Sequence, residues 1–432
     1  MRGARRAAVL TAAAALVLSG CGSDDAPPAG WSGRYSDSGN TASTSTPGLD
    51  DVTFSWTRPT GGMVGSPVTI APNGQIFVTA TTDAGCNLFS FRVDHGRKRW
   101  CTRLAPGVAD VSPLVDEQAN IYVGEDGEFF SFNEHGQRRW RIPVSGTPRS
   151  AQFAPDGSVV VVTHFGQVNV VDPQTGRLRA PVFDLLPLPG VGDGTNIPRQ
   201  ASDHGLAACF GGSPDCPVAT TPAVDPSSGR ILTTVWRPGA DRAALVALRY
   251  TGGDDAVVTE EWSFDDLPGG AVTSPVLSAD GTTVYVHDGT GALWALDAAT
   301  GAPRWNHDVG FVPSTGPAVT PDGTLVLAAG GDAGPLVAVR DGGDAPETVW
   351  ERDDVRQIGV PALTANGRGY TVVDGEDEPV ALVFDLADGT TVDQEPLEGT
   401  SGFSPGTAVG PDGELVTVTV PGDVYVLAAP TA

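Results

Sequence analysis

The fold is decided by residues 273–305, which read TSPVLSADGTTVYVHDGTGALWALDAATGAPRW. Runs of β-branched and aromatic residues separated by Asp-Gly and Thr-Gly turns predict four short strands in this stretch. The first three strands are expected at residues 274–278, 283–287 and 292–297, and the fourth ends at Trp305. The turns are expected at 279–281 and 298–301. This unit is the fullest copy of a phrase that recurs along the chain.

The turn after the first strand of the unit is the best-preserved part of the repeat. Pro presets φ, Asn or Asp tolerates the left-handed region, and Gly supplies a positive φ, so this tripeptide suits a tight hairpin. Six clear copies occur at residues 72–74, 155–157, 279–281, 321–323, 365–367 and 411–413, and two weaker ones at 118–120 and 227–229. A β-branched or aromatic strand follows each copy. The sequence therefore contains eight units.

Tryptophans supply a second, independent register for the repeat. Trp100, Trp140, Trp262, Trp305 and Trp350 each close a unit, and successive steps include 40, 43 and 45 residues. Ala180 and Asp393 stand at the equivalent place in the third and seventh units. Four strands at a period of about 43 residues are the signature of a β-propeller blade.

Trp56 indicates how the ring closes. The eighth unit ends with its third strand at residues 424–428, and residues 52–56 precede the first complete unit. A strand from the N-terminal side would complete the last blade and remove two exposed sheet edges. The predicted fold is an all-β, eight-bladed propeller over residues 51–429, closed by an N-terminal outer strand.

The N-terminus predicts export. Three arginines (Arg2, Arg5, Arg6) precede an apolar run at 7–18, which suits a signal peptide of residues 1–20. Leu18-Ser19-Gly20-Cys21 resembles the bacterial lipoprotein box, which implies palmitate on Cys21 and anchoring on the outer side of the cytoplasmic membrane. The alternative is an ordinary signal peptide that happens to hold a cysteine. Residues 21–50, rich in Ser, Thr, Gly, Asp and Pro, are expected to form a flexible tether.

The tryptophan motif carries a resemblance to a known family. Ala295, Asp297, Thr300, Gly301 and Trp305 occupy the positions of the tryptophan-docking motif of quinoprotein-dehydrogenase-like propellers. The resemblance implies that each outer-strand tryptophan packs toward the neighbouring blade. The expected docking residues are Trp56, Trp100, Trp140, Trp262, Trp305, Trp350, Asp297, Thr300 and Gly301. The lipobox, tether and propeller together resemble the propeller lipoprotein of the outer-membrane barrel-assembly machinery, which implies a non-enzymatic scaffold.

Charge and cysteine usage narrow the possible partners. Against 26 Lys and Arg stand 52 Asp and Glu, a net charge of −26 that excludes nucleic acid as a partner. In an oxidising compartment, Cys86 with Cys101 and Cys209 with Cys216 are expected to form disulfides. No Cys-x-x-Cys or Cys/His pattern of a metal site is present.

One segment is not explained by the repeat. Residues 181–219, rich in Pro and Gly, fall between the third and fourth blades and carry Leu185, Leu186, Leu188 and Phe210. A long loop in a compact fold is functional or disordered, and the disulfide Cys209–Cys216 favours an ordered binding lid.

The sequence favours a monomeric binding or scaffold protein whose partner is an envelope protein, and it predicts no catalytic, cofactor or metal residue. The alternative is a pyrroloquinoline-quinone-dependent dehydrogenase, or a small-ligand sensor, that uses the central funnel and calcium. Two departures weigh against the quinone. No two cysteines adjoin, and no calcium-ligand set or catalytic Asp of the dehydrogenases aligns with this chain.

Overall fold

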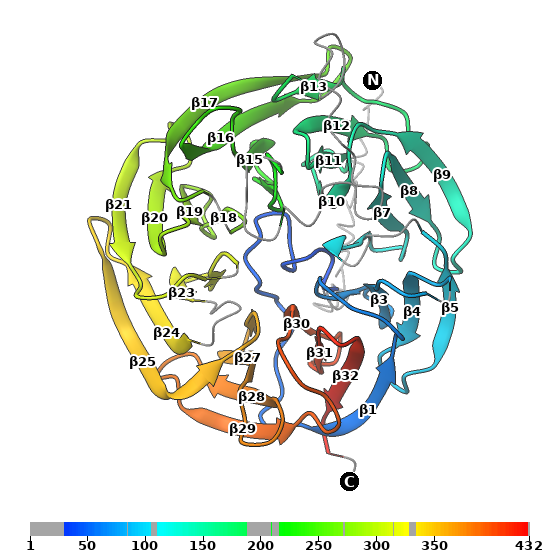
Figure 1. Cartoon of the computed structure of the whole chain (residues 1–432), viewed down its shortest axis with the longest axis vertical. Helices are drawn as coiled ribbons and strands as arrows, with labels where there is room; N and C mark the ends of the chain where they lie inside the picture. Colours follow the sequence, from blue (N-terminus) through cyan, green and yellow to red (C-terminus); the bar gives the residue numbers. More distant parts are fainter. Residues whose placement is uncertain are drawn as a thin grey trace, which may run out of the picture.

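The computed structural model describes residues 30–83, 85–104, 110–187, 209, 216–270, 273–313, 315–327 and 334–430. Within these ranges the regular secondary structure consists of β-strands, which form small twisted sheets arranged in a ring around a central axis (Figure 1). The chain is therefore an all-β propeller. In the described part of the chain, no helix is long and apolar enough to cross a membrane.

The strands form sheets of four, which we call blades. Blade 1 contains β2 (Thr69–Ile70), β3 (Gln75–Thr79), β4 (Leu88–Arg92) and β5 (Lys98–Thr102). Blade 2 contains β6 (Leu114–Val115), β7 (Ile121–Glu125), β8 (Glu128–Phe132) and β9 (Arg138–Pro143). Blade 3 contains β10 (Pro148–Phe153), β11 (Val159–Thr163), β12 (Gln167–Val171) and β13 (Phe183–Asp184). Blade 4 contains β14 (Ala223–Val224), β15 (Arg230–Val235), β16 (Arg242–Thr251) and β17 (Val257–Pro268).

Blade 5 contains β18 (Val276–Leu277), β19 (Thr283–His287), β20 (Ala292–Asp297) and β21 (Pro303–Asp308). Two further runs of four strands join through the single pair Gln357–Val373 into one eight-stranded sheet. Blade 6 contains β22 (Ala318–Val319), β23 (Thr324–Val326), β24 (Gly334–Asp341) and β25 (Pro346–Gln357). Blade 7 contains β26 (Ala362–Leu363), β27 (Arg368–Val373), β28 (Val380–Asp385) and β29 (Thr391–Pro396).

The last sheet joins the two ends of the propeller. It contains β30 (Gly406–Val409), β31 (Leu415–Val418), β32 (Asp423–Ala428) and, as its outer strand, β1 (Thr53–Pro59). The strand predicted at residues 52–56 thus begins one residue later and continues to Pro59. Trp56 pairs with Val426, and Pro59 pairs with Asp423. We call this sheet blade 8.

The core lies between neighbouring blades. Strands in the middle of a blade are buried on both faces, so they read as continuous apolar runs such as VVVVT in β11. Outer strands face solvent on one side and alternate accordingly, as in β21, where Trp305 is the buried residue. One core cluster contains Val160 from blade 3 and Ile231 from blade 4, so adjacent blades share their apolar side chains.

The repeated turn has the geometry that its residues predict. The glycines at positions 74, 157, 229, 281, 323, 367 and 413 all have positive φ, between 69° and 86°. At the corresponding turn of blade 2, residues 118–120, the residue with positive φ is Ala119, at 57°. A tight turn therefore persists there without glycine, with backbone strain of about 1–2 kcal/mol.

The prediction of a flexible tether at residues 21–50 is wrong for residues 30–50. Trp31 and Asn40 are each 1% exposed, and Tyr35 is 6% exposed. This segment, which we call the axial segment, crosses the centre of the ring (Figure 1). Its two large aromatic side chains give it apolar surface to bury, which a Ser- and Gly-rich composition concealed. Residues 21–29, including Cys21, lie outside the described residues.

Candidate binding surfaces around the ring axis

The propeller has two faces with different loops. On one face, which we call the turn face, lie the turns between the first and second strands of each blade. The turns between the third and fourth strands lie on the same face. The opposite face, which we call the connection face, carries the loops between the second and third strands of each blade. It also carries the loops that lead from one blade to the next. The repeated turns, such as Asp280-Gly281, lie on the turn face, and residues 216–220, which lead into blade 4, lie on the connection face.

Each docking tryptophan packs on the turn of the next blade, as the motif predicted. Trp56, Trp100, Trp140, Trp262 and Trp350 lie against Gly96, Gly136, Gly176, Gly301 and Gly389, at distances that leave no room for a Cβ atom. Their indole N–H groups donate to carbonyl oxygens in the same turns, for example Trp100 to Glu134 at 2.7 Å. Trp305 donates to the Asp341 carboxylate at 2.8 Å. The tryptophans therefore hold the ring together and are not a ligand site.

The residues of the motif turn stabilise the turn itself. Asp297 Oδ1 accepts hydrogen bonds from the backbone N–H groups of Ala299 and Thr300, and from the Thr300 hydroxyl at 2.9 Å. Arg304 donates to the other carboxylate oxygen at 2.9 Å. The hydrogen bonds from Arg304 and Thr300 hold the pKa of Asp297 below its ordinary value. Gly301, with φ of 72°, receives the indole of Trp262.

The axial segment satisfies the free edges of the inner strands. Trp31 and Ser32 carbonyls accept hydrogen bonds from the N–H groups of Ile70 in blade 1 and Val115 in blade 2. Four later carbonyls of the axial segment accept hydrogen bonds from the first strands of blades 4, 5, 6 and 7, with N···O distances of 2.6–2.9 Å. The acceptors are Ser38, Gly39, Thr41 and Ala42, and the respective donors are the N–H groups of Val224, Leu277, Val319 and Leu363. An inner strand of a propeller otherwise presents unpaired N–H groups to the channel. The axial segment is therefore an integral part of the fold.

Asn40 joins three blades at the axis. Its Nδ2 group donates to the Pro275 carbonyl at 2.9 Å and to the Thr221 carbonyl at 3.3 Å. Its Oδ1 atom accepts from Gln152 Nε2 at 2.7 Å. All four hydrogen-bonding groups are buried, so this contact fixes the segment against blades 3, 4 and 5.

A buried charged cluster lies where the axial segment approaches the connection face. Arg34 Nη1 donates to the Asp110 carbonyl at 3.4 Å and to Ser66 Oγ at 3.5 Å. Arg149 is 8% exposed and donates to the Ala219 carbonyl, while its Nε has no hydrogen-bond partner. Burial lowers the pKa of Arg149 to about 10, and burial raises the pKa of Asp110. No local sequence pattern predicts this cluster.

The described ends of the insertion pack into the ring. The predicted bounds 181–219 are too wide, because Phe183 and Asp184 form β13 and complete blade 3. Leu186 is 7% exposed and belongs to the core cluster that also contains Val218, so it does not offer a free apolar surface. Leu188 and Phe210 lie outside the described residues.

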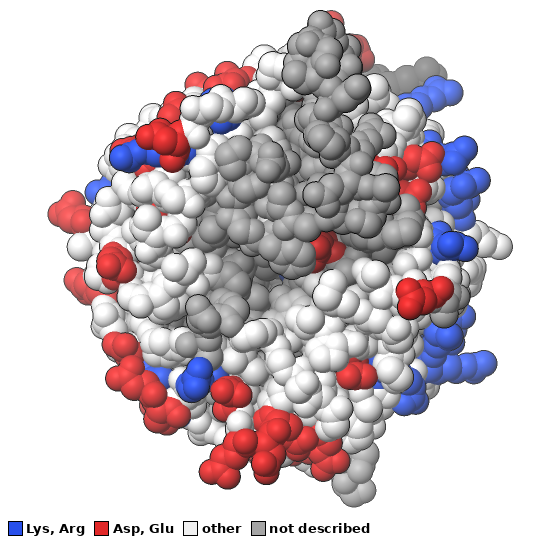
Figure 2. All heavy atoms as spheres, viewed as in Figure 1, with Lys and Arg blue, Asp and Glu red and all other residues white. Residues whose placement is uncertain are grey.

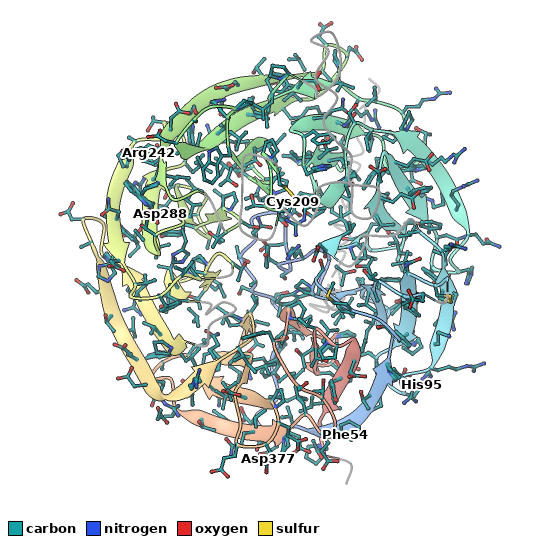
Figure 3. All side chains as sticks on the ribbon, in the orientation of Figure 1. Phe54, His95, Cys209, Arg242, Asp288 and Asp377 are labelled. Carbon is teal, nitrogen blue, oxygen red and sulfur yellow. A yellow bond between two sulfur atoms is a disulfide. The ribbon has the colours of Figure 1, made fainter. Side chains whose placement is uncertain are left out.

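Both expected disulfides are present. Cys86 and Cys101 join with Cα atoms 5.6 Å apart, and Cys209 and Cys216 with Cα atoms 5.1 Å apart. Figure 3 shows Cys209 on the inner side of the ring, and both its side chain and that of Cys216 are buried. The disulfide Cys209–Cys216 therefore lies on the inner side of the ring, packed against Ala219, whose carbonyl Arg149 contacts.

A cavity of about 1240 Å³ opens between the axial segment and blades 4 to 7. It lies at the turn-face end of the ring and is lined by backbone, hydroxyl groups and charged side chains from the repeated turns, among them Asp280 and Arg340. Asp37 lines it too, and burial raises the pKa of this carboxyl group.

The residues present do not fit a quinone cofactor. Trp31, Tyr35 and Asn40 occupy the axis where the funnel would have to receive a planar ring system. Within the described ranges, no group of three or more His, Cys, Asp or Glu side chains is arranged to hold a metal ion. The geometry therefore supports no step through quinone or calcium.

The fold, the docking tryptophans and the closing strand define a propeller built from PQQ-like repeats. The model of the family described as outer membrane protein assembly factor BamB matches residues 34–182 and 222–428, and the chain belongs to this family. The matched ranges leave out most of the insertion and include most of the axial segment.

Three known proteins show the range of this similarity. Protein Rv3035 of Mycobacterium tuberculosis is 39% identical over 419 residues, which cover 94% of this chain and 99% of that protein. The crystal structure of BamB from Moraxella catarrhalis superposes with a TM-score of 0.57 at 15% identity, covering 87% of this chain and 99% of the other. A europium-containing methanol dehydrogenase superposes with a TM-score of 0.60 at 14% identity, covering 93% and 98%. The two structural likenesses concern the fold alone.

Proposed function

We propose that this protein is an exported, lipid-anchored scaffold that binds an envelope protein through its connection face. The proposed ring has eight blades, counting the two halves of the eight-stranded sheet separately, and is closed by β1. The observation that carries the proposal is the axial segment, because it lays the protein's own chain across the axis of the ring, where an enzyme of this fold would bind its cofactor. Membership of the BamB family supports a binding role.

The connection face carries exposed apolar side chains suited to a partner. Met63 is 45%, Val312 51% and Phe403 39% exposed, and all three lie in loops between blades. Met63 and Phe403 lie in neighbouring loops, because Val420 N–H donates to the Phe403 carbonyl at 3.0 Å and the Val420 carbonyl accepts from Val64 at 3.1 Å. Exposed apolar side chains that gather on one face mark protein-binding surfaces.

Partner capture from native envelope extracts tests this function. The double substitution Met63→Ser and Phe403→Ser should reduce capture of the wild-type partner at least tenfold while leaving the fold intact. Phe54→Ser is the matched control, because Phe54 is also 45% exposed but lies on the outer rim in β1 (Figure 3). Equal capture by the double variant and the control would place the binding surface elsewhere.

Replacing residues 188–208 by a short Gly-Ser linker tests the insertion separately. The disulfide Cys209–Cys216 and the packed residues Leu186 and Val218 remain in this variant. Loop shortening changes closure entropy by about 0.6 kcal/mol per halving of length, so thermal stability should change little. A lid predicts a sharp loss of partner capture, whereas unchanged capture would make the insertion a peripheral loop.

Anchoring and catalysis have their own tests. Cys21→Ala should release the protein from the membrane fraction, and continued acylation of this variant would contradict the lipobox.

Soaking the purified protein with pyrroloquinoline quinone and calcium tests the alternative function, a quinone-dependent dehydrogenase. A bound chromophore with dye reduction would support the dehydrogenase and overturn the scaffold.

A further inference from the structure

Positive charge on this acidic protein is concentrated on one side of the ring. The outer strands of blades 1 and 2 carry it, and Figure 2 shows Lys and Arg side chains gathered over β5 and β9. We call this surface the basic wall. Its members are Arg97, Lys98, Arg99, Arg103, Arg138, Arg139 and Arg141.

Among the described residues, the basic wall has fewer ion pairs than blades 4 to 7. In the described part of the chain, Arg97, Lys98, Arg99, Arg103 and Arg138 form none, and all five are exposed. Arg141 pairs with Glu128 at 3.1 Å. By contrast, every described arginine from residue 223 to 430 has an acidic partner: Arg230, Arg237, Arg242, Arg249, Arg304, Arg340, Arg352, Arg356 and Arg368. The charge of the basic wall is available to a partner outside the protein.

The opposite side of the ring is acidic. The outer strand β25 of blade 6 carries Glu347, Glu351, Asp353 and Asp354. Asp393 and Glu395 follow on β29. Figure 2 shows these acidic side chains on the rim away from the basic wall. The ring therefore has a charge dipole that would turn it in the field of an anionic surface.

The membrane anchor leaves the ring at the same blade. Gly30, the first described residue, lies against Ile70 and Pro72 of blade 1, within 3 Å of where its own Cβ would stand. Cys21 precedes it by nine residues, which span about 30 Å when fully extended. The acyl chains on Cys21 would thus hold blade 1 close to the bilayer.

We propose that the basic wall docks on anionic phospholipid headgroups of the membrane that anchors the chain. This inference rests on the proposed acylation of Cys21. The anchor keeps blade 1 near the membrane, and the positive charge of the basic wall attracts the anionic headgroups. The acidic blades 6 and 7 then point away from the bilayer. Each basic residue near an anionic surface strengthens binding on the order of fivefold. The ring then stands edge-on, which leaves the connection face open to a protein partner.

Energy transfer to labelled lipids tests this orientation. The acylated full-length protein is reconstituted in vesicles of phosphatidylcholine alone or of an equal mixture with phosphatidylglycerol. A fluorescent amino acid replaces Gln137 beside the basic wall or Asp344 beside β25, and both positions are exposed. In the mixed vesicles, transfer from position 137 should exceed transfer from position 344. Because the anchor alone holds blade 1 near the bilayer, a smaller difference should remain in phosphatidylcholine alone and at high ionic strength, and the excess over it measures docking.

Charge variants identify the surface. Lys98→Gln, Arg99→Gln and Arg138→Gln together should lower the difference in mixed vesicles to its value in phosphatidylcholine alone. The matched control, Arg177→Gln, Arg242→Gln and Arg356→Gln, removes the same charge elsewhere and should keep the full difference. Equal transfer from both positions in mixed vesicles would overturn the proposal. An undiminished difference in the first triple variant would also overturn it, because the orientation would then not depend on the charge of the basic wall.

A second preparation separates docking from acylation. Mature protein in which Cys21 is coupled to a maleimide-bearing lipid receives the same anchor by chemical means. If native protein fails to float with vesicles but the coupled protein shows the difference, the lipobox is wrong and the docking surface stands. If the coupled protein shows no difference, the docking proposal is wrong whatever the native anchor is.

Discussion

The indole ring of Trp100 lies directly on Gly136 of the next blade. A Cβ atom added to Gly136 would stand 2.6 Å from Cδ2 of Trp100, and the Gly136 φ is 75°. The same contact links Trp56 with Gly96 and Trp140 with Gly176. Each of these blades therefore receives the tryptophan of its predecessor on the turn that precedes its own outer strand. This chain of contacts explains why glycine and tryptophan recur at a fixed spacing.

Gly136→Ala should destabilise the ring by about 2–4 kcal/mol. The substitution adds both an overpacked contact with Trp100 and an alanine in the left-handed region. The control is Gly157→Ala, because Gly157 has a similar φ of 77° but nothing within 4 Å of its Cβ position. That variant should lose only about 1–2 kcal/mol. Urea unfolding of both variants measures the difference, and equal losses would show that Trp100 moves away at no cost.

Trp56→Ala should cost about 3–5 kcal/mol, since a large buried aromatic is removed from the junction between the first and last blades. Trp56 is 5% exposed, and its Nε1 donates to the Val93 carbonyl at 2.7 Å. Phe54→Ala on the same strand is the control, because Phe54 is exposed and should change stability little. Comparable losses in the two variants, measured by urea unfolding, would contradict a closing role for Trp56.

The blade repeat could be predicted because its residues act locally. Asp297 and Gly301 form their turn from neighbouring backbone atoms, and the spacing of Trp305 follows from the strand that it ends. The Cys86–Cys101 pairing followed from a hairpin. The tryptophan of one blade and the turn glycine of the next both belong to the repeated sequence motif. The contact between blades could therefore also be predicted from the sequence.

The axial segment could not be predicted for the opposite reason. Its contacts join residues far apart in sequence, such as Asn40 with Pro275, and no local pattern encodes them. Trp31 and Tyr35 were the one available signal, since large aromatic side chains are unusual in a solvated tether. Arg34, Asp110 and Arg149 likewise meet only because three distant parts of the chain converge at the axis.

Stability should fall in acid partly because of His287. Burial lowers the pKa of His287 to about 3, and neither ring nitrogen has a hydrogen-bond partner. The unfolded chain binds a proton at this residue below about pH 6.5, whereas the native state stays neutral. The contribution of neutral His287 to the free energy of unfolding is therefore complete above pH 6.5. It is lost as the pH falls toward 3, by up to about 1.4 kcal/mol per pH unit.

His287→Leu tests this assignment. The variant should flatten the fall in unfolding free energy between pH 6 and pH 4 relative to wild type, because leucine takes up no proton in the unfolded chain. His135→Leu is the control, since the His135 side chain is 59% exposed. A pH profile of His287→Leu parallel to that of wild type would mean that His287 is protonated in the native state.

Asn40→Ala should cost about 2–4 kcal/mol, because it leaves the buried Gln152 amide and two buried carbonyls without their partner. Asn40 also has φ of 62°, which adds strain for alanine. Asn40→Gly removes the same hydrogen bonds without that strain, so it should be the more stable of the two variants while remaining well below wild type. Ser45→Ala, at an exposed position of the axial segment, should have almost no effect. Urea unfolding of the three variants in the full chain gives the values. If Asn40→Gly were as stable as wild type, the axial segment would be held by its backbone hydrogen bonds alone, and the link between blades 3, 4 and 5 would carry no energy.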